Sequence, residues 1–203
     1  MKRLLINYKD RGKDYSNVVL IALIVVLTLL TAFFLWSSTF YKVYVIGPSM
    51  ESTLIGADNG SEAGGHFVYA NRYETPKRGD IIIINTGSKT LIKRLIAIGG
   101  DVVEIKHGVV YLNDRALLED YVSELNNIEK ADYPQITVPA GYMFCLGDNR
   151  DDSNDSRSEE YGCMPVSWTE GVVTWWSIRN KKVLTSLNTF LEFTLPSAFS
   201  GGK

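Results

Sequence analysis

The hydrophobic pattern opens with an uninterrupted apolar run, residues 18–36 (VVLIALIVVLTLLTAFFLW), which contains neither a charge nor a proline. As a helix, this run is about 28 Å long at 1.5 Å per residue, close to the hydrocarbon thickness of a bilayer. Trp36, Phe40 and Tyr41 stand at its far end, where aromatic rings favour the membrane interface. The run therefore predicts a transmembrane helix. The alternative is a cleaved signal peptide, whose apolar core is shorter and ends in small residues, here residues 37–38.

Charged residues on the two sides of this run predict its direction. The first basic residue after it is Lys42, whereas five basic residues stand before it. These five are Lys2, Arg3, Lys9, Arg11 and Lys13. Because positive charge tends to stay on the cytoplasmic side, we expect residues 1–17 in the cytoplasm and residues 37–182 outside the membrane.

Beyond residue 37 the pattern changes to short apolar or alternating segments, separated by turns rich in glycine, asparagine and aspartate. Segments of this length and spacing predict antiparallel β-sheets rather than βαβ units, so we expect a mainly β domain after the helix. The predicted strands are residues 42–46, 66–72, 81–84, 90–98, 102–105, 109–112, 135–138, 142–146 and 171–178. Residues 57–65 are predicted to be a loop, and residues 119–133 a polar excursion with some helix.

The last segment has helical spacing. Val183, Leu187 and Leu191 recur at intervals of about one turn until Pro196 stops the pattern. The segment is too short to cross a bilayer. We therefore predict that residues 183–203 are a C-terminal tail containing a packed or interfacial helix.

Composition and charge narrow the possible partners. The chain has 203 residues, of which 45% are hydrophobic and 22% charged, and this fits one folded domain plus an anchor. Residues 37–203 hold 16 Lys and Arg against 21 Asp and Glu, a net charge of −5. An acidic domain lacks the basic surface that nucleic acid requires, and anionic lipid repels it. We expect no nucleic-acid partner, and contact with lipid through the N-terminal anchor.

Two positions stand out chemically. Ser49 follows the first predicted outer strand, at a turn, where most serines are structural. Lys93 lies inside an otherwise apolar strand, next to Arg94, so two-residue alternation directs one of these two cations toward an apolar face. A lysine at the edge of a sheet could also reach water with its amine.

A buried lysine and a serine complement each other chemically. Burial disfavours the ammonium form, and a neutral amine can accept a proton from a serine hydroxyl. At a pKa of about 10.4 only roughly 0.04% of lysine is neutral at pH 7, and a pKa of about 8 raises this to roughly 10%. Both histidines, His66 and His107, lie in predicted loops or turns and are weaker candidates for the base.

The segment 147–157 (GDNRDDSNDSR) concentrates Asp, Asn, Arg and Ser behind a hydrophobic strand. A calcium loop is one alternative, but Ser156 stands at the position that requires glycine and Gly162 at the position of the final glutamate. Arg150 and Arg157 instead indicate a loop whose carboxylates pair internally with guanidinium groups. We expect no metal and no cofactor.

Four segments occur in an order that resembles the signature boxes of bacterial type I signal peptidases. They are GPSMESTL, PKRGDIIII, IKRLIAIGGDVVEI and GDNRDDSNDSR, in residues 47–54, 76–84, 92–105 and 147–157. The resemblance implies a membrane-bound serine endopeptidase with an antiparallel β catalytic domain. It also implies that the protein removes signal peptides from exported preproteins, after small residues of the Ala-x-Ala type, on the outer side of the bacterial cell membrane.

The resemblance also implies roles for individual residues. Ser49 matches the nucleophile, Lys93 the general base, and Ser153 the serine that orients the lysine. Asp155 and Arg157 match a structural ion pair. Three more residues match supporting positions, and these are Met50 beside the substrate pocket, Arg94 beside the base, and Gly47 at the oxyanion hole.

Two departures from the family pattern affect the turn around the nucleophile. Gly47 replaces a serine that donates its hydroxyl to the oxyanion hole in larger members, so the second oxyanion donor is open, beside the backbone N–H of Ser49. Ser52 replaces the usual proline, and we expect this change to loosen the turn. One anchor and a short connection between residues 101 and 142 indicate a minimal form of the enzyme.

Other interpretations remain at this point. One is a pilus or secretion assembly factor of the same fold, either dedicated to pilin-like clients or non-proteolytic; another is a self-cleaving repressor, which would be cytosolic and bind DNA. Residues 78–80 spell an integrin-recognition tripeptide, Arg-Gly-Asp. Cys145 and Cys163 form either a disulfide or two buried thiols. The pair at residues 175–176, two tryptophans, is predicted as core in preference to a surface that dips into lipid.

Overall fold

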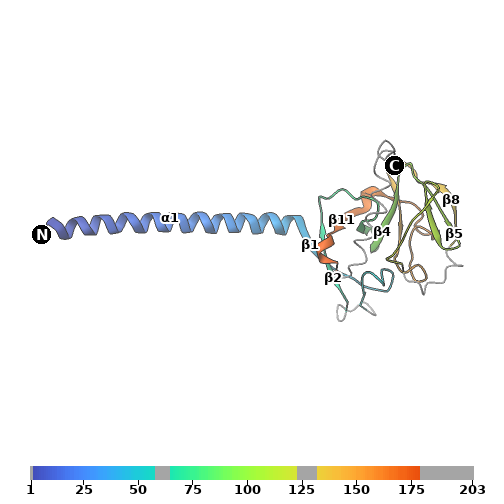
Figure 1. Cartoon of the computed structure of the whole chain (residues 1–203), viewed down its shortest axis with the longest axis horizontal. Helices are drawn as coiled ribbons and strands as arrows, with labels where there is room; N and C mark the ends of the chain where they lie inside the picture. The colour runs from blue at the N-terminus through green and yellow to red at the C-terminus, as the bar shows by residue number, and fades with distance from the viewer. Residues whose placement is uncertain (1, 58–64, 123–131, 179–203) are drawn as a thin grey trace, which may run out of the picture. The chain divides into compact units, whose positions relative to one another are not determined.

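The computed structural model of the chain describes residues 2–57, 65–122 and 132–178, and Figure 1 shows its elements in order. The chain separates into two units, Met1–Phe40 and Tyr41–Lys203. The loop at 58–64, part of the excursion at 119–133 and the tail at 183–203 lie outside the described residues, so the predictions made for them stay predictions.

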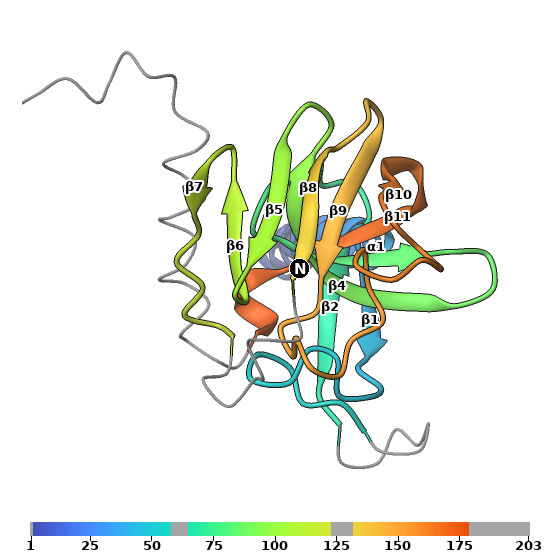
Figure 2. The ribbon, with the colours of Figure 1, turned by 90° about the vertical axis from the view of Figure 1, so that its right-hand side faces the viewer.

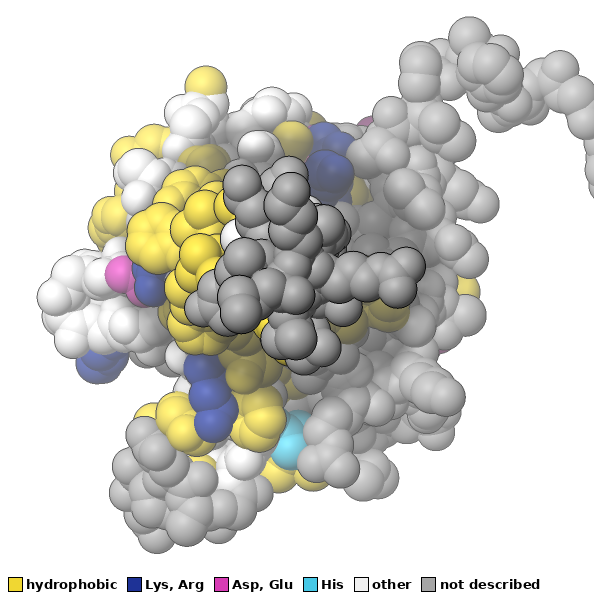
Figure 3. Space-filling model, turned by 90° about the vertical axis from the view of Figure 1, so that its left-hand side faces the viewer, with side chains coloured by type: hydrophobic (Ala, Val, Ile, Leu, Met, Phe, Trp, Pro, Cys, Tyr) yellow, Lys and Arg dark blue, Asp and Glu magenta, His cyan; other side chains and the backbone are white. Residues whose placement is uncertain are grey.

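The first unit is the helix α1, Lys2–Thr39, which confirms the predicted helix and extends it at both ends. Its part Tyr15–Thr39 is long and apolar enough to cross a membrane, with a mean hydropathy of 3.1. The hydroxyls of Thr28 and Thr31 donate to carbonyls three or four residues earlier, which leaves these polar groups satisfied within the helix. The apolar side chains of this part are exposed, and Figure 3 shows hydrophobic side chains reaching the surface.

The second unit is built of two antiparallel sheets (Figures 1 and 2). A seven-stranded sheet has the order β1-β2-β11-β3-β4-β9-β10, and a four-stranded sheet has the order β7-β6-β5-β8. The larger sheet contains β1 Phe40–Tyr44, β2 Phe67–Asn71, β3 Ile81–Asn85, β4 Thr90–Ile98, β9 Tyr142–Leu146, β10 Met164–Pro165 and β11 Thr169–Val173. The smaller sheet contains β5 Val102–Lys106, β6 Val109–Leu112, β7 Arg115–Ala116 and β8 Tyr133–Thr137.

The middle of the larger sheet is buried on both faces. Four consecutive isoleucines of β3, Ile81 to Ile84, are all 2% exposed or less, and they alternate between two apolar clusters. A run of β-branched residues suits a strand covered on both sides, because both faces then need apolar side chains. Lys93 of β4 pairs with Ile82 and Arg94 pairs with Ile81, so both cations enter this dry interior.

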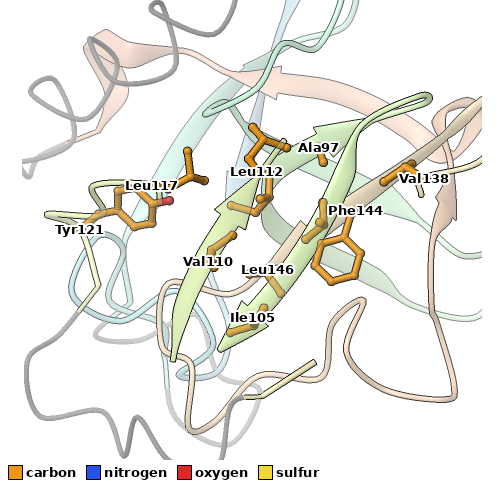
Figure 4. Packing of buried hydrophobic residues seen from close by; sticks show 11 residues of the cluster. Ala97, Ile105, Val110, Leu112, Leu117, Tyr121, Val138, Phe144 and Leu146 are labelled. Carbon is orange, nitrogen blue, oxygen red and sulfur yellow. The ribbon is translucent and has the colours of Figure 1, made fainter. Parts of the chain in front are cut away.

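A third apolar cluster lies where the smaller sheet meets the larger one (Figure 4). It combines Ala97 of β4 and Phe144 and Leu146 of β9 with Val110 and Leu112 of β6. The cluster therefore attaches the smaller sheet to the two strands that lead toward Lys93 and the 147–157 loop.

The last predicted strand, residues 171–178, is wrong in its second half. β11 ends at Val173, and Trp175–Ser177 forms the 3₁₀ helix η4. The hydroxyl of Ser177 donates to the carbonyl of Thr174, and such local bonds compete with the sheet ladder. The two tryptophans are 68% and 46% exposed, so the prediction that they belong to the core is also wrong.

The remaining strand predictions hold within two residues, and residues 90–98, 109–112 and 142–146 agree fully with β4, β6 and β9. The pattern missed three short elements, the strands β7 and β10 and the 3₁₀ helix η3, Val166–Trp168. Elements of two or three residues are too short to show a hydrophobic period.

Candidate active site

Ser49 and Lys93 meet, although 44 residues separate them in the chain. The Nζ atom of Lys93 lies 2.7 Å from the Oγ atom of Ser49. Lys93 is held by the centre of β4 and is 3% exposed, whereas the turn that follows β1 keeps Ser49 half-buried. A hydroxyl within hydrogen-bond distance of an amine, and still open to solvent on one side, has the geometry of a nucleophile beside its base.

The surroundings of Lys93 favour the neutral amine. Burial lowers the pKa of Lys93 below the ordinary lysine value, and the carboxylates of Asp155 and Asp148 only partly oppose this effect. The structural reason is the apolar packing on both faces of β4, which removes water from the amine.

Contacts from two sides hold the backbone of the turn that carries Ser49. Asn149 donates its backbone N–H to the carbonyl of Ser49 at 3.1 Å and its side-chain amide to the carbonyl of Pro48 at 3.2 Å. On the other side, a Cβ atom on Gly56 would lie 1.9 Å from the carbonyl oxygen of Gly47, so the two backbones approach too closely for any side chain. Gly47 itself has a φ of +79°, a conformation that favours glycine. Its N–H donates to Ala57, and that bond already uses its one backbone proton.

Arg94 lies beside the base in a buried ion pair. Its guanidinium donates to both carboxylate oxygens of Asp148, at 2.8 and 2.6 Å, and to the carbonyl of Gly79 at 2.8 Å. The side chains of Arg94 and Asp148 are 1% and 0% exposed. A bidentate pair of this kind has little freedom to rotate, so it ties β4 to the start of the 147–157 loop.

Asp155 and Arg157 form the ion pair expected inside the same loop. Arg157 donates to both oxygens of Asp155 at 2.9 Å, and the backbone N–H of Gly147 adds a third bond at 3.0 Å. Burial by itself would raise the pKa of Asp155, but these hydrogen bonds outweigh it and the pKa is lowered. Asp155 is therefore a fixed negative charge near Lys93.

Ser153 does not make the contact with the lysine that was expected, whereas the expected place of Met50 beside the substrate pocket stays a prediction. The Oγ atom of Ser153 is buried without a regular hydrogen-bond partner in the described part of the chain, so it makes no bond to Lys93. It lies against the backbone of Gly147, near enough to Asp155 to help lower the pKa of that group. Met50 is 1% exposed and packs in an apolar cluster with Leu54, so it supports the turn from beneath.

Arg150 pairs differently from the prediction. Its guanidinium donates to Glu119 at 2.6 and 3.0 Å, instead of to a carboxylate of its own loop. Asp148, Glu119 and Tyr121, which packs beside Arg94, were not singled out from the sequence. The sequence signal for these residues was the concentration of charge in the 147–157 loop. That signal could not show that Arg150 pairs with Glu119, about 30 residues earlier in the chain.

The structure does not favour a function for the two cysteines or for the Arg-Gly-Asp tripeptide. Cys145 and Cys163 are free thiols, and burial raises the pKa of Cys145, which opposes a thiolate. In the Arg-Gly-Asp tripeptide, Arg78 is engaged with both oxygens of Asp101, at 2.7 and 2.8 Å. Neither feature presents a free reactive or recognition group.

Residues 17–177 match the family described as signal peptidase, peptidase S26. A signal peptidase I from Bacillus licheniformis is 38% identical over 163 residues, which cover 75% of this chain and 81% of that protein. A probable signal peptidase I-1 from a Synechocystis strain is 32% identical over 154 residues, covering 70% of this chain and 71% of that protein.

Among solved structures, the crystal structure of a signal peptidase I from Enterococcus faecalis V583 is 35% identical, with a TM-score of 0.41, and it covers 50% of this chain and 98% of that one. The family match spans both the helix and the β domain, including every residue of the four motifs. The chain therefore belongs to the signal peptidases of peptidase family S26 and is a bacterial type I signal peptidase, a serine endopeptidase that removes signal peptides.

Proposed function

We propose that this enzyme cuts with a Ser49–Lys93 dyad. The observation that carries the proposal is the 2.7 Å contact between Ser49 Oγ and the buried Nζ of Lys93. Because burial favours the neutral amine, Lys93 can take the hydroxyl proton while Oγ attacks the scissile carbonyl carbon.

The remaining steps use the same two groups. Once the tetrahedral intermediate has formed, the Lys93 ammonium gives its proton to the leaving amine, and the C–N bond breaks to leave an ester on Ser49. Lys93, neutral again, takes a proton from water, and the hydroxide attacks the ester carbonyl. Collapse breaks the bond between the carbonyl carbon and Ser49 Oγ, Lys93 returns its proton to Oγ, and the released carboxylic acid loses its own proton to water. The backbone N–H of Ser49 is one donor to the oxyanion.

The proposed substrates are exported preproteins whose signal peptides end in small residues of the Ala-x-Ala type. An extended segment can add as a strand at an exposed sheet edge, where main-chain hydrogen bonds bind it and small pockets select its side chains. The edge strands of the larger sheet are β1 and β10, and β1 leads directly into the turn of Ser49.

We also propose that residues 18–36 anchor the enzyme in the membrane, with residues 1–17 in the cytoplasm and residues 37–182 outside. The support is the apolar helix Tyr15–Thr39 together with the excess of basic residues before it. In this arrangement the peptidase domain meets preproteins as they emerge from the membrane.

Cleavage of a preprotein with an Ala-x-Ala site, in detergent–lipid micelles, tests the dyad. Ser49→Ala and Lys93→Ala are expected to abolish cutting. Lys89→Ala is the matched control, because this lysine lies in the turn between β3 and β4, just before the strand of Lys93, with a side chain that is 62% exposed. Retained cutting in Lys93→Ala would require another base. A wild-type enzyme that cuts nothing would favour a non-proteolytic assembly factor.

A further inference from the structure

A short segment that follows the smaller sheet contacts the parts of the chain that carry Ser49 and Lys93. We call Leu117–Val122, the residues that follow β7, the strap. Leu117 and Tyr121 are 6% and 2% exposed and belong to the cluster between the two sheets (Figure 4). The backbone N–H of Leu117 donates to Val110 of β6 at 2.8 Å, so the start of the strap is fixed to the smaller sheet.

The strap holds the turn of Ser49 through Ser52. The hydroxyl of Ser52 donates to the backbone carbonyl of Tyr121. Ser52 has a φ of +81°, which the ring of proline cannot adopt, so the residue that replaces the usual proline belongs to a different turn. The expectation that this replacement loosens the turn stays a prediction, and the serine hydroxyl adds a bond from the turn to the strap that a proline could not make.

The strap also covers the residue next to the base. The guanidinium carbon of Arg94 lies 3.8 Å from the centroid of the Tyr121 ring, in a cation–π contact. The hydroxyl of Tyr121 donates to Glu119 at 2.6 Å, which fixes the rotation of the ring. Since Arg94 follows Lys93 directly in β4, this contact restrains the strand at the base itself.

The third contact is with the 147–157 loop. Glu119 accepts two bonds from Arg150, and both side chains are nearly buried, at 9% and 3% exposed. Arg150 donates in turn to the carbonyl of Gly147 at 3.1 Å, next to Asp148. A buried ion pair is costly to break on one side only, so this network favours a single arrangement.

We propose that the strap is a positioning element that sets the distance between Ser49 and Lys93, with Tyr121 and Glu119 as its positioning residues. The inference rests on the proposed dyad. The turn of Ser49, strand β4 and the loop come from three distant parts of the chain. The turn and β4 both contact Tyr121, and the loop contacts Glu119, to which Tyr121 donates. A misplacement of about 1 Å between reacting groups can lower a rate about 100-fold, so a shared contact that positions both partners acts on the rate.

The test compares strap variants in the full-length enzyme on a peptide with Ala at the two recognition positions. Ser52→Ala and Tyr121→Phe each remove one hydroxyl, and Tyr121→Leu also removes the ring beneath Arg94. We expect kcat to fall roughly 10- to 100-fold in Tyr121→Leu and less in the two milder variants, with KM changed less than about twofold. Tyr121→Phe is the conservative rescue of Tyr121→Leu, since it restores the ring.

The control is Ile84→Ala, because Ile84 is fully buried at the end of β3 and pairs with Leu91, away from the strap. Its melting temperature is expected to fall while kcat stays near the wild-type value. If Tyr121→Leu and Ser52→Ala also lower the melting temperature and leave kcat near the wild-type value, the strap stabilises the fold without positioning the dyad, and the proposal is overturned. If Ser49→Ala or Lys93→Ala still cuts, the dyad has failed instead, whatever the strap variants do.

Discussion

At the scale of single residues, the protonation of the Lys93 amine depends on the groups that surround it. It is 3% exposed, and Asp155 and Asp148 are the carboxylates that oppose the effect of burial. The charge of Arg157 acts in the same direction as burial. The apolar β4 therefore supplies the condition that a serine–lysine pair needs at neutral pH, a fraction of neutral amine.

The burial of Lys93 predicts how the rate of cleavage depends on pH. Since the pKa of Lys93 is lowered, the base is neutral above that pKa, so kcat/KM is expected to rise with pH along a limb below the ordinary lysine value of about 10.4. A pH series on a peptide substrate measures this limb. Lys89→Ala should leave the limb in place, and a limb centred at the ordinary lysine value would contradict the prediction.

The ion pair of Arg94 and Asp148 predicts a large loss of stability on truncation. Arg94→Ala removes the guanidinium that binds both oxygens of the buried carboxylate of Asp148, at a cost of about 3–5 kcal/mol in the free energy of unfolding. Denaturant titration of the full-length protein measures the cost. Lys106→Ala, which breaks the exposed pair with Glu104, is the control and should leave the midpoint unchanged. Equal effects in the two variants would contradict the interpretation.

At the scale of elements, the turn of Ser49 depends on two backbones that touch. A Cβ atom on Gly56 would meet the carbonyl of Gly47 at 1.9 Å, so the turn can accept a side chain there only by moving. Because Gly47 precedes the nucleophile by two residues, that movement reaches Ser49.

Gly56→Ala is therefore expected to lower kcat by roughly 100-fold, with a smaller change in KM. The control is Gly87→Ala at the tip of the β3–β4 hairpin, where φ is +85° and a Cβ atom meets nothing within 4 Å. That variant should lose about 1–2 kcal/mol of stability and keep its kcat. Steady-state kinetics with a melting curve separates the two outcomes, and normal kcat in Gly56→Ala would mean that the turn is not held by this contact.

Element boundaries show where local pattern and long-range packing disagree. The central strands were predictable, because β4 carries apolar residues on both faces and Gly-rich turns at its end. β11 was predicted too long, since Trp175 and Trp176 look like a continuation of a strand. The strand ends instead at hydrogen bonds that link Thr174 to Ser177 and to Tyr69 of the neighbouring strand β2. The residues around position 174 give no sign that Tyr69, about 100 residues earlier, lies beside them.

At the scale of the whole molecule, the proposed topology predicts which residues a membrane-impermeant reagent can reach. With the enzyme in intact cells, Ser38→Cys should react with an impermeant maleimide and Ser16→Cys should not, because the two serines flank the apolar run. The wild-type chain is the background control, since Cys145 is buried and Cys163 partly so. If Ser16→Cys is labelled and Ser38→Cys is not, the helix crosses the membrane in the opposite direction and the proposed topology is wrong.

The amino-acid sequence was enough to predict the apolar helix, the mainly β domain, most of its strands and, through four motifs, Ser49 and Lys93 as candidates. These features depend on residue type and on periods of two or 3.6 residues, which neighbouring residues set. Long-range folding brings Lys93 into a buried position 2.7 Å from Ser49, pairs Arg150 with Glu119, and places the strap against both the turn of Ser49 and Arg94. These are contacts between distant segments, and burial, distance and charge pairing exist only once the chain has folded back on itself.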